Sequence, residues 1–507
     1  MPHRGKKAWT HWLRLRFLTR LVLCWVVAAS AESLTAEEPI SRELLLLRQQ
    51  LDGQSGVIDQ LRRQSELQQR QLDELRQSFT HEEPSGLQVA EFVDRVPPAS
   101  DGAAPGPRGL QYGYSDGFFV TSPDQVKIGA KDAPFTIKAN VRMQLRHTYF
   151  NSDGPTRDEN NFEFERAFLI FTGNVFTPDL AYHIKIDGDS DDGEVLDLLD
   201  AFATYDVGHA LLECSPGTFG IKGGKWKMPF HRARYENGFN LQFSDRTMAS
   251  ESFDINRSIG AGLYGRLDFL PRPVNWEAAV FNGFQTQKFV PGRAEELDRN
   301  LATSVRLFSD VVGDYGKDGE PDLSFHDAPA VRIGAAFARS RLNKKDGLRE
   351  FSVLRVVDTG ATLASILPAT VNEFDAFLYS VDANFKYRGL SLLSEYYFRS
   401  LTQFSGTAVP NLFDHGFMLQ GGYFAVRDKL ELLARWSRVV GDSSTLGLRN
   451  RSADEVAGGL AWYIRGQNLK LVSDVTHLNG ATVNSTATNI RPRDDGWLFR
   501  TQFQIMF

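Results

Sequence analysis

The sequence predicts an all-β protein: a transmembrane antiparallel β-barrel of about sixteen strands, preceded by an N-terminal α-helical coiled coil. Three observations support this fold class. From Phe135 onward, apolar and polar residues alternate with a period of two in one segment after another. The connections between these segments alternate between short and long. The last such segment ends on Phe507, whereas terminal residues of soluble domains are commonly frayed and polar.

The first element, residues 1–31, is predicted to be a secretory signal peptide. Six basic residues precede the apolar run 21–29, and Ala-Ser-Ala at 29–31 offers a small-x-small cleavage site. A lipoprotein signal with Cys24 as the acylated residue is disfavoured because the bulky Leu23 stands where a small residue is needed. Cleavage would leave 57 − 6 = 51 basic and 63 acidic residues, a net charge of −12. We therefore expect an exported acidic protein with no nucleic-acid partner.

The mature chain is predicted to have no disulfide and no membrane-spanning helix. Cys214 is its only cysteine, so no internal disulfide can form. No stretch after the signal approaches the roughly 20 apolar residues that a spanning helix needs. Insertion by strands remains open.

The second element, residues 32–80, is predicted to be a periplasmic coiled-coil segment. Leucines and other apolar residues recur in heptads from 41 to 79, separated by Gln, Arg and Glu. Gly53 and Gly56 weaken the middle of this pattern, and a single amphipathic helix lying on the domain is the alternative. A coiled coil needs partner helices, so the favoured interpretation implies an oligomer. Residues 81–110, which contain five prolines, are predicted to be a linker.

The third element, residues 111–507, is predicted to form the barrel. In "FTIKANVRMQLRHTYF", which starts at Phe135, apolar residues share one face while Lys, Arg, Asn and Gln share the other. Similar alternation recurs up to the final segment, where Trp497, Phe499 and Phe503 oppose Arg500 and Gln502. Helical patterns of comparable strength are absent from this region.

Connection lengths distinguish a membrane barrel from a soluble β-sandwich, which also alternates. Five short links fall at 176–180, 270–274, 386–390, 426–430 and 465–469, with longer polar links between them. An outer-membrane barrel has this asymmetry, with tight periplasmic turns and long external loops. Two links, 208–217 and 309–328, are long where short ones are expected, so the strand count is uncertain by a hairpin. The aromatic content of 12% suits a lipid-facing surface, although a sandwich would place those side chains in a core.

Several blocks of this region resemble the phosphate-selective porins of the bacterial outer membrane. The blocks, in the order of that family, are "NFEFERAFLIFTGNVF" (161–176), "DLLDAFATYDV" (197–207), "GGKWKMPF" (223–230), "WEAAVFNG" (276–283), "EVAGGLAWYIRGQNLKL" (455–471) and the terminal "FQIMF". The resemblance implies a sixteen-stranded trimeric channel. A residue-by-residue match to a phosphate-binding ladder is lacking, so phosphate as the permeating solute follows only from the family.

The polar parity of the strands supplies candidate pore-lining, anion-binding residues. Apolar residues must face lipid, so the opposite parity faces the pore. Guanidinium groups bind phosphate or carboxylate bidentately, and a basic pore wall favours anions. Inward acids such as Asp187, Asp382, Glu395 and Asp474 leave cation selectivity as the alternative. The candidates are Lys138, Arg142, Arg146, Lys185, Arg266, Arg306 and Arg332.

The long link 231–257 is the predicted constriction loop. It is the third external loop, and in many trimeric porins that loop folds into the barrel. It brings basic residues together with acids that include Asp245, Glu251 and Asp254. A plain extracellular loop is the alternative. The candidate constriction residues are Arg232, Arg234, Arg246 and Arg257.

No catalytic site, metal site or cofactor is predicted. The histidines show no paired metal spacing, and hydrolase and P-loop motifs are absent. The acidic stretch 187–194 resembles a calcium loop, but Leu198 stands where glutamate is required, so an acidic external turn is favoured.

These observations predict an outer-membrane porin through which small anions, such as phosphate or polyphosphate, diffuse passively. We expect it to be a homotrimer in the lipid bilayer, with its N-terminal segment in the periplasm. Phe507 resembles the terminal aromatic assembly signal of outer-membrane barrels. The alternatives are a general or organic-solute porin, and an architectural protein tethered to the cell wall through its coiled coil.

Overall fold

The structure, a computed structural model, describes residues 110–507 except 116, 123–126, 129–130, 133, 189–195, 287, 289–296, 318, 345–347, 357–359 and 443–451. The chain divides into two compact units, Met1–Gly102 and Ala103–Phe507, and every described residue belongs to the second. The predicted signal peptide, coiled coil and linker therefore lie outside the described residues, apart from Leu110 at the end of the linker.

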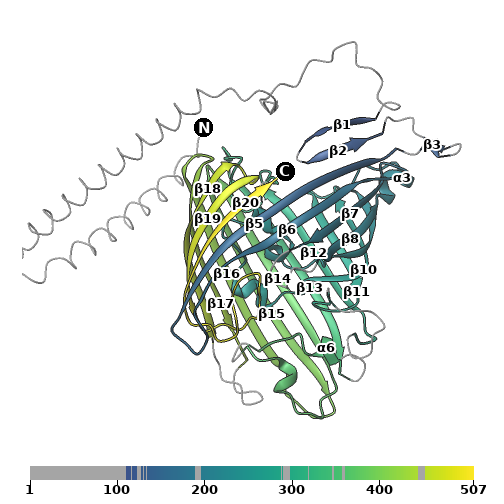
Figure 1. The fold of residues 1–507 in the computed structure, drawn as a ribbon. Coiled ribbons are helices and arrows are strands. Elements are labelled where there is room, and N and C mark those ends of the chain that lie inside the picture. Colours follow the sequence, from purple (N-terminus) through teal and green to yellow (C-terminus); the bar gives the residue numbers. More distant parts are fainter. Residues whose placement is uncertain are drawn as a thin grey trace, which may run out of the picture. The chain divides into compact units, whose positions relative to one another are not determined.

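Sixteen antiparallel strands, β5 to β20, close into a barrel (Figure 1). Each strand pairs with its neighbour in sequence, and β20 pairs with β5. The predicted fold class and the strand number are thus confirmed for this unit. The strands are β5 (Thr136–Ser152), β6 (Glu159–Asn174), β7 (Leu180–Asp187), β8 (Asp197–Tyr205), β9 (Phe219–Lys227), β10 (Arg257–Leu267), β11 (Val274–Phe281), β12 (Ala302–Val312), β13 (Ala330–Asn343), β14 (Glu373–Tyr387), β15 (Leu390–Ser405), β16 (Leu412–Val426), β17 (Leu430–Val440), β18 (Ser452–Arg465), β19 (Leu469–Asn479) and β20 (Gly496–Met506).

The barrel is closed by the C-terminal strand. β20 pairs with β5 from Gly496 opposite Ser152 to Met506 opposite Arg142. Beyond it, the Phe507 amide donates to the Val141 carbonyl at 3.0 Å and the Val141 amide donates back at 2.7 Å. Closure gives the backbone of both strands its partners and leaves no open edge along this seam.

The two faces of the strands separate by polarity as the alternation predicts. On β20, Arg500 and Gln502 are almost fully buried inside the barrel, whereas Trp497 and Phe499 are each 43% exposed on its outside. Within the described part of the chain, no helix is long and apolar enough to cross a membrane.

Connections at the two ends of the barrel differ in length, which confirms the predicted asymmetry. At the end where the chain terminates, β14 and β15 are joined by residues 388–389 and β16 and β17 by 427–429. The two long links anticipated at this end are 206–218, which holds the helix α3 (Val207–Leu212), and 313–329. We refer to this end as periplasmic and to the other as external, which is the orientation that the connection lengths predict.

Several long connections fold into the barrel. Residues 228–256 contain α4 (Arg232–Tyr235), the 3-10 turn η2 (Gly238–Asn240) and α5 (Met248–Ser252). Residues 344–372 contain α6 (Leu348–Phe351) and the 3-10 turn η3 (Leu363–Ser365). Apolar side chains from these loops pack with inward wall residues, including Phe230, Phe281, Phe351 and Phe374, and this cluster is the largest apolar core of the described unit.

A small hairpin precedes the barrel. Strands β1 (Gln111–Tyr114) and β2 (Phe118–Thr121) pair with each other, and β2 also pairs with β5 over 136–139. Two two-residue strands, β3 (Lys127–Ile128) and β4 (Lys131–Asp132), form a separate pair. The sequence patterns did not predict this hairpin.

Candidate functional site

The candidate site is built around residues 228–256, which we call the inner loop. Phe239, Asp245 and Met248 on this loop are completely buried. The loop contacts wall residues from strands that are well separated around the barrel, such as Gln504 on β20 and Glu395 on β15. The structure therefore places the predicted constriction loop inside the barrel, while its role in selectivity remains a prediction.

Acidic side chains of the wall hold the inner loop by its backbone. Glu395 accepts hydrogen bonds from the amides of Arg232 at 2.7 Å and Ala233 at 3.0 Å, at the start of α4. Glu455 accepts from the Met248 amide at 2.6 Å, at the start of α5. Amides at a helix start have no partner within the helix, so a carboxylate there satisfies them. These inward acids are thus engaged with the loop.

Asp474 anchors a third part of the loop. It accepts a hydrogen bond from the Ser244 amide at 3.0 Å. The same carboxylate is paired with Arg500 on β20 at 2.9 Å. One inward acid therefore joins the loop to the closing strand of the barrel.

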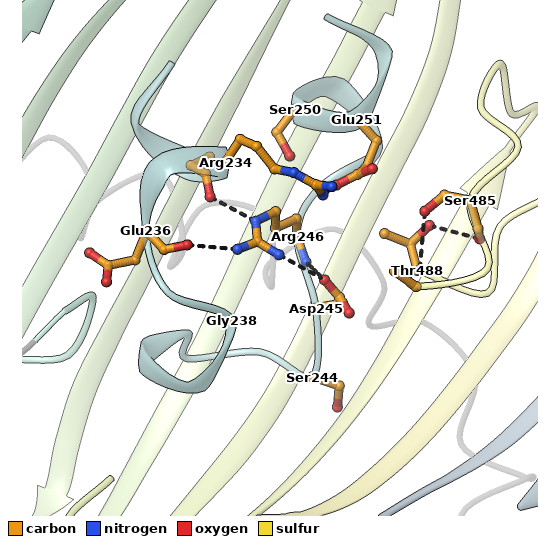
Figure 2. A network of polar contacts seen from close by, with 12 residues as sticks. Arg234, Glu236, Gly238, Ser244, Asp245, Arg246, Ser250, Glu251, Ser485 and Thr488 are labelled. Carbon is orange, nitrogen blue, oxygen red and sulfur yellow. Dashed lines mark hydrogen bonds and ion pairs between the residues drawn. The ribbon is translucent and has the colours of Figure 1, made fainter. Parts of the chain in front are cut away.

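Asp245 joins the inner loop to strands β5 and β6 of the wall through arginines. Its carboxylate lies 2.9 Å from Arg146 on β5 and 2.7 Å from Arg166 on β6, and 3.7 Å from Arg246 on the loop itself. Figure 2 shows Asp245 and Arg246 side by side, with Glu236 on the other side of the Arg246 guanidinium. Burial would raise the pKa of Asp245, but Arg166 and Arg146 outweigh it and hold that pKa well below its usual range.

Arg146, a predicted anion-binding residue, is committed to this junction. Its guanidinium donates to Gln502, Glu165, Asn489, Asp245 and the Ser244 carbonyl. It is completely buried. These hydrogen bonds join the inner loop to the wall of the barrel.

The other predicted pore-lining residues lie at different depths. Lys185 pairs with Asp200 at 3.0 Å and Arg306 with Asp382 at 2.8 Å, and all four are buried inside the barrel. The remaining four are less buried. Arg332 pairs with Asp310 at 2.6 Å, and the exposed Arg266 pairs with Asp268 at 2.6 Å near the periplasmic end. Lys138 and Arg142 are half-buried on β5.

The predicted constriction residues also have acidic neighbours. Arg234 lies 2.8 Å from Glu251 and 3.1 Å from Asp254 (Figure 2 shows the first of these pairs). Arg257 donates to Asp200 at 2.7 Å. Arg232 has weaker partners, with Glu236 at 3.7 Å and Glu320 at 3.9 Å.

Arg246 is the predicted constriction residue with the least acidic compensation. Its donors go to the carbonyl oxygens of Ala233 at 2.8 Å and Glu236 at 2.7 Å. Burial, followed by the charge of Arg234, lowers the pKa of Arg246 to about 10. Its positive charge is therefore held in place largely by neutral oxygens.

A cavity of about 340 Å³ lies between the inner loop, the wall and the loop 480–495. Nine basic and four acidic residues line it, so basic residues outnumber acidic ones by 9 − 4 = 5 in the lining. Asp200 and Asp245, which pair with Lys185, Arg257 and Arg166, are not part of the lining and compensate some of this charge. The basic residues are Arg166, Lys185, Lys227, Arg234, Arg246, Arg257, Lys288, Arg355 and Arg399, and the acidic ones are Glu165, Asp187, Glu251 and Asp254.

Lys227, at the end of β9, lies among the basic residues of this cavity. Its ammonium donates to the Glu236 carbonyl at 2.8 Å. Burial disfavours the charged form of its side chain, and so do the positive charges of Arg246, Arg257, Lys185 and Arg234. Among the described residues, no carboxylate forms an ion pair with it. An anion bound beside Lys227 would therefore favour its charged form.

Sequence reasoning missed Lys227 and Arg166 because both break the alternation. The pairing of β5 with β6 shifts so that Gln144 faces Arg166 while Leu145 faces Phe164. The extra residue, Glu165, is a β-bulge, and both Glu165 and Arg166 become buried inside the barrel. The change of apolar parity from Phe164 to Ala167 was the available signal.

A second connection approaches the inner loop from the periplasmic end. Residues 313–329, which we call the periplasmic segment, enter the barrel. The Glu320 amide donates to the Asn240 carbonyl at 3.1 Å, and the Glu320 carboxylate accepts from the Gln242 amide at 2.9 Å. Gln420 on β16 donates to the same carboxylate at 2.8 Å. The inner loop, which enters from the external end, and the periplasmic segment therefore meet inside the barrel, and both narrow its lumen there.

Searches against protein-family models and against curated proteins found no match. Among solved structures, an anion-selective porin from Comamonas acidovorans is similar with a TM-score of 0.48 and 10% identity, over 73% of this chain and 99% of that one. The outer membrane channel DcaP of Acinetobacter baumannii has a TM-score of 0.44 and 11% identity, over 76% and 100%. OmpT of Vibrio cholerae has a TM-score of 0.45 and 10% identity, over 76% and 100%. Similarity at this level carries no argument about what the present chain transports.

Proposed function

We propose that this chain is an outer-membrane porin through which small anions, with phosphate or polyphosphate as the favoured class, diffuse passively. The observation that carries the proposal is that basic residues outnumber acidic ones in the lining of the internal cavity, where Lys227 lies among arginines. The preference for phosphate also draws on the resemblance of the sequence blocks.

The membrane setting is supported by the wall of the barrel. The outward side chains are apolar on strand after strand, as Ile259 and Leu263 on β10 and Leu419 on β16 illustrate. In water such a surface would be a very large exposed apolar area. In lipid this apolar surface contacts a favourable solvent, and the closed sheet gives the backbone N–H and C=O groups of the barrel strands their hydrogen-bond partners.

Anion preference is supported by how the lumen uses its acids. Glu395, Glu455 and Asp474 accept hydrogen bonds from the inner-loop backbone, and Asp245 is surrounded by arginines. Basic residues consequently outnumber acidic ones in the cavity lining that a solute would meet. Guanidinium groups present paired donors that match phosphate oxygens, and a lysine adds a point charge.

A trimer is the proposed assembly, and the outer wall offers a surface for it. The strands β7 and β11 have eight residues each. Eight residues rise roughly 26 Å along the strand, which with a tilt of about 45° covers roughly 19 Å of an apolar band about 25 Å tall. An apolar groove of about 1010 Å³ lies on this wall, lined by small residues that include Ala203, Gly223, Ala261 and Ala278. A second copy packed here would cover the short wall.

Two charge-removing variants on one strand test the anion site. Lys227→Gln removes one basic group from the lining of the cavity. Lys225→Gln, two residues earlier, is the matched control because Lys225 donates to the Leu198 carbonyl and does not line the cavity. We expect Lys227→Gln to lower the anion-to-cation permeability ratio in planar bilayers and Lys225→Gln to leave it unchanged. If the two variants have the same anion-to-cation permeability ratio, Lys227 does not lie on the permeation path.

The alternatives predict different measurements. A general or organic-solute porin would pass neutral sugars into liposomes as readily as phosphate. A cell-wall tether would lose envelope attachment but keep its conductance when residues 41–79 are deleted. Loss of trimers in that deletion would instead assign the segment to assembly.

A further inference from the structure

The hairpin β1–β2 lies where the closing strand stops. β20 covers one edge of β5 from Ser152 down to Arg142, and Phe507 extends this contact to Val141. The remaining start of β5 projects beyond that point, and β2 pairs with it over 136–139. The hairpin therefore supplies backbone partners to a stretch of β5 that β20 leaves uncovered (Figure 1).

The outward face of the hairpin continues the outward face of the wall. Directly opposed residues of antiparallel strands lie on the same side of the sheet. Tyr112 is opposite Val120, which is opposite Ile137 on the outside of β5. Tyr114 is likewise opposite Phe118. One apolar surface thus runs without a break from the barrel wall onto the hairpin.

This continued surface is aromatic and more exposed than the wall itself. Tyr112 is 84% exposed and Phe118 57%, compared with 43% for Phe499 on β20. The rings of Tyr114 and Phe118 lie edge to face with centroids 5.3 Å apart. Tyrosine and tryptophan side chains favour the boundary between hydrocarbon and headgroups because one end is apolar and the other polar, and phenylalanine adds apolar contact on the hydrocarbon side.

We propose that the outward face of the hairpin, formed by Tyr112, Tyr114, Phe118 and Val120, binds the headgroup boundary of the periplasmic leaflet of the bilayer. It would extend the lipid contact of the barrel beyond the end of its closing strand. The occupant is lipid because the face is continuous with a wall that the proposed function already places in lipid, and the inference rests on that placement. The opposite face, with Gln111, points away from this surface.

Depth-dependent fluorescence quenching tests the inference in the full mature chain. In a Cys214→Ser background, single cysteines replace Tyr112, Gln111 or Phe499 and carry an environment-sensitive fluorophore in proteoliposomes. Nitroxides placed near the lipid headgroup and an aqueous collisional quencher then report what each position contacts. Gln111 is the matched control because it adjoins Tyr112 on the opposite face, and Phe499 reports the barrel wall.

The inference predicts lipid-nitroxide quenching at Tyr112 and Phe499, and aqueous quenching at Gln111. Aqueous quenching at Tyr112 with lipid quenching at Phe499 would overturn the inference and leave the membrane barrel standing. Protection of Tyr112 from both quenchers would also overturn it, because a protein partner would then cover the face. Absence of lipid quenching at Phe499 would overturn the proposed membrane placement and the inference with it.

Discussion

Replacing Asp245 by Asn should loosen the inner loop from the wall. Asn keeps the size of the side chain but removes the charge that lies 2.9 Å from Arg146 and 2.7 Å from Arg166. All three side chains are nearly fully buried, so the two guanidinium groups cannot regain solvent without the loop moving. Removing one partner of a buried ion pair costs about 3–5 kcal/mol.

The remaining anchors should prevent complete release of the loop. Glu395 holds two amides, and Glu455 and Asp474 hold one each. Hydrogen bonds to charged groups contribute about 1.5–3 kcal/mol each. Four such bonds together exceed the loss at Asp245. We therefore expect more frequent local opening rather than an unfolded barrel.

Hydrogen exchange of residues 228–256 in nanodiscs measures this opening. A loss of about 3 kcal/mol corresponds to exchange roughly 100-fold faster, because 1.4 kcal/mol is a factor of ten. Asp268→Asn is the matched control because Asp268 pairs with Arg266 at an exposed site, where an ion pair contributes only about 0–1 kcal/mol. Equal exchange of the inner loop in both variants would refute the assignment of Asp245 as its anchor.

Three further predictions concern the ends of the barrel. Burial, followed by the charge of Asp298, raises the pKa of Glu350 to about 8 from 4.5. The folded state therefore holds a proton that the unfolded state releases, and stability falls as pH rises from 4.5 to about 8. Glu350→Gln should consequently slow hydrogen exchange of residues 348–356 at about pH 9 and leave it unchanged at about pH 4, and equal exchange at the higher pH would contradict this. Gly319 has a φ of +77°, and a Cβ there would lie 2.4 Å from the Asn240 Cβ. Gly319→Ala should separate the periplasmic segment from the inner loop and raise single-channel conductance, and an unchanged conductance would show that this contact does not limit the current. Deletion of Phe507 removes both hydrogen bonds to Val141, so the amount of folded barrel in the membrane should fall, as measured by heat-modifiable mobility on gels.

The alternation of residue types was sufficient to predict the strands, their closure and the inward rows. Arg500 and Gln502 on β20 lie inside, as their parity requires, because a strand with one face in lipid fixes its register strongly. The lengths of the connections were sufficient to distinguish the two ends of the barrel, because short turns gather at one end and long loops at the other.

Local irregularities explain the residues that the pattern missed. The bulge at Glu165 reverses the parity of β6 and brings Arg166 inside. Lys227 shares its parity with Ile221, which is 45% exposed on the outside, so alternation alone excludes it from the lumen. Gly224, with a φ of +131°, interrupts the regular strand between them. The period of two describes a regular strand and fails where the backbone departs from one.

The pairing of charges was beyond sequence reasoning for a different reason. Asp245 and Arg246 are adjacent in the chain, but Arg146 and Arg166 meet the same carboxylate only because the inner loop crosses the barrel. The net negative charge of the whole chain also does not predict the basic lining of this cavity. The excess of basic residues is a property of the residues around one cavity, which only the folded chain brings together.

We propose above that the internal cavity gives the pore a preference for anions. The reversal potential of the purified mature protein in a planar bilayer, under a potassium chloride gradient, tests this most directly. We expect a reversal potential with the sign set by chloride, and a reduced chloride current when phosphate is added. A reversal potential with the sign set by potassium would contradict it.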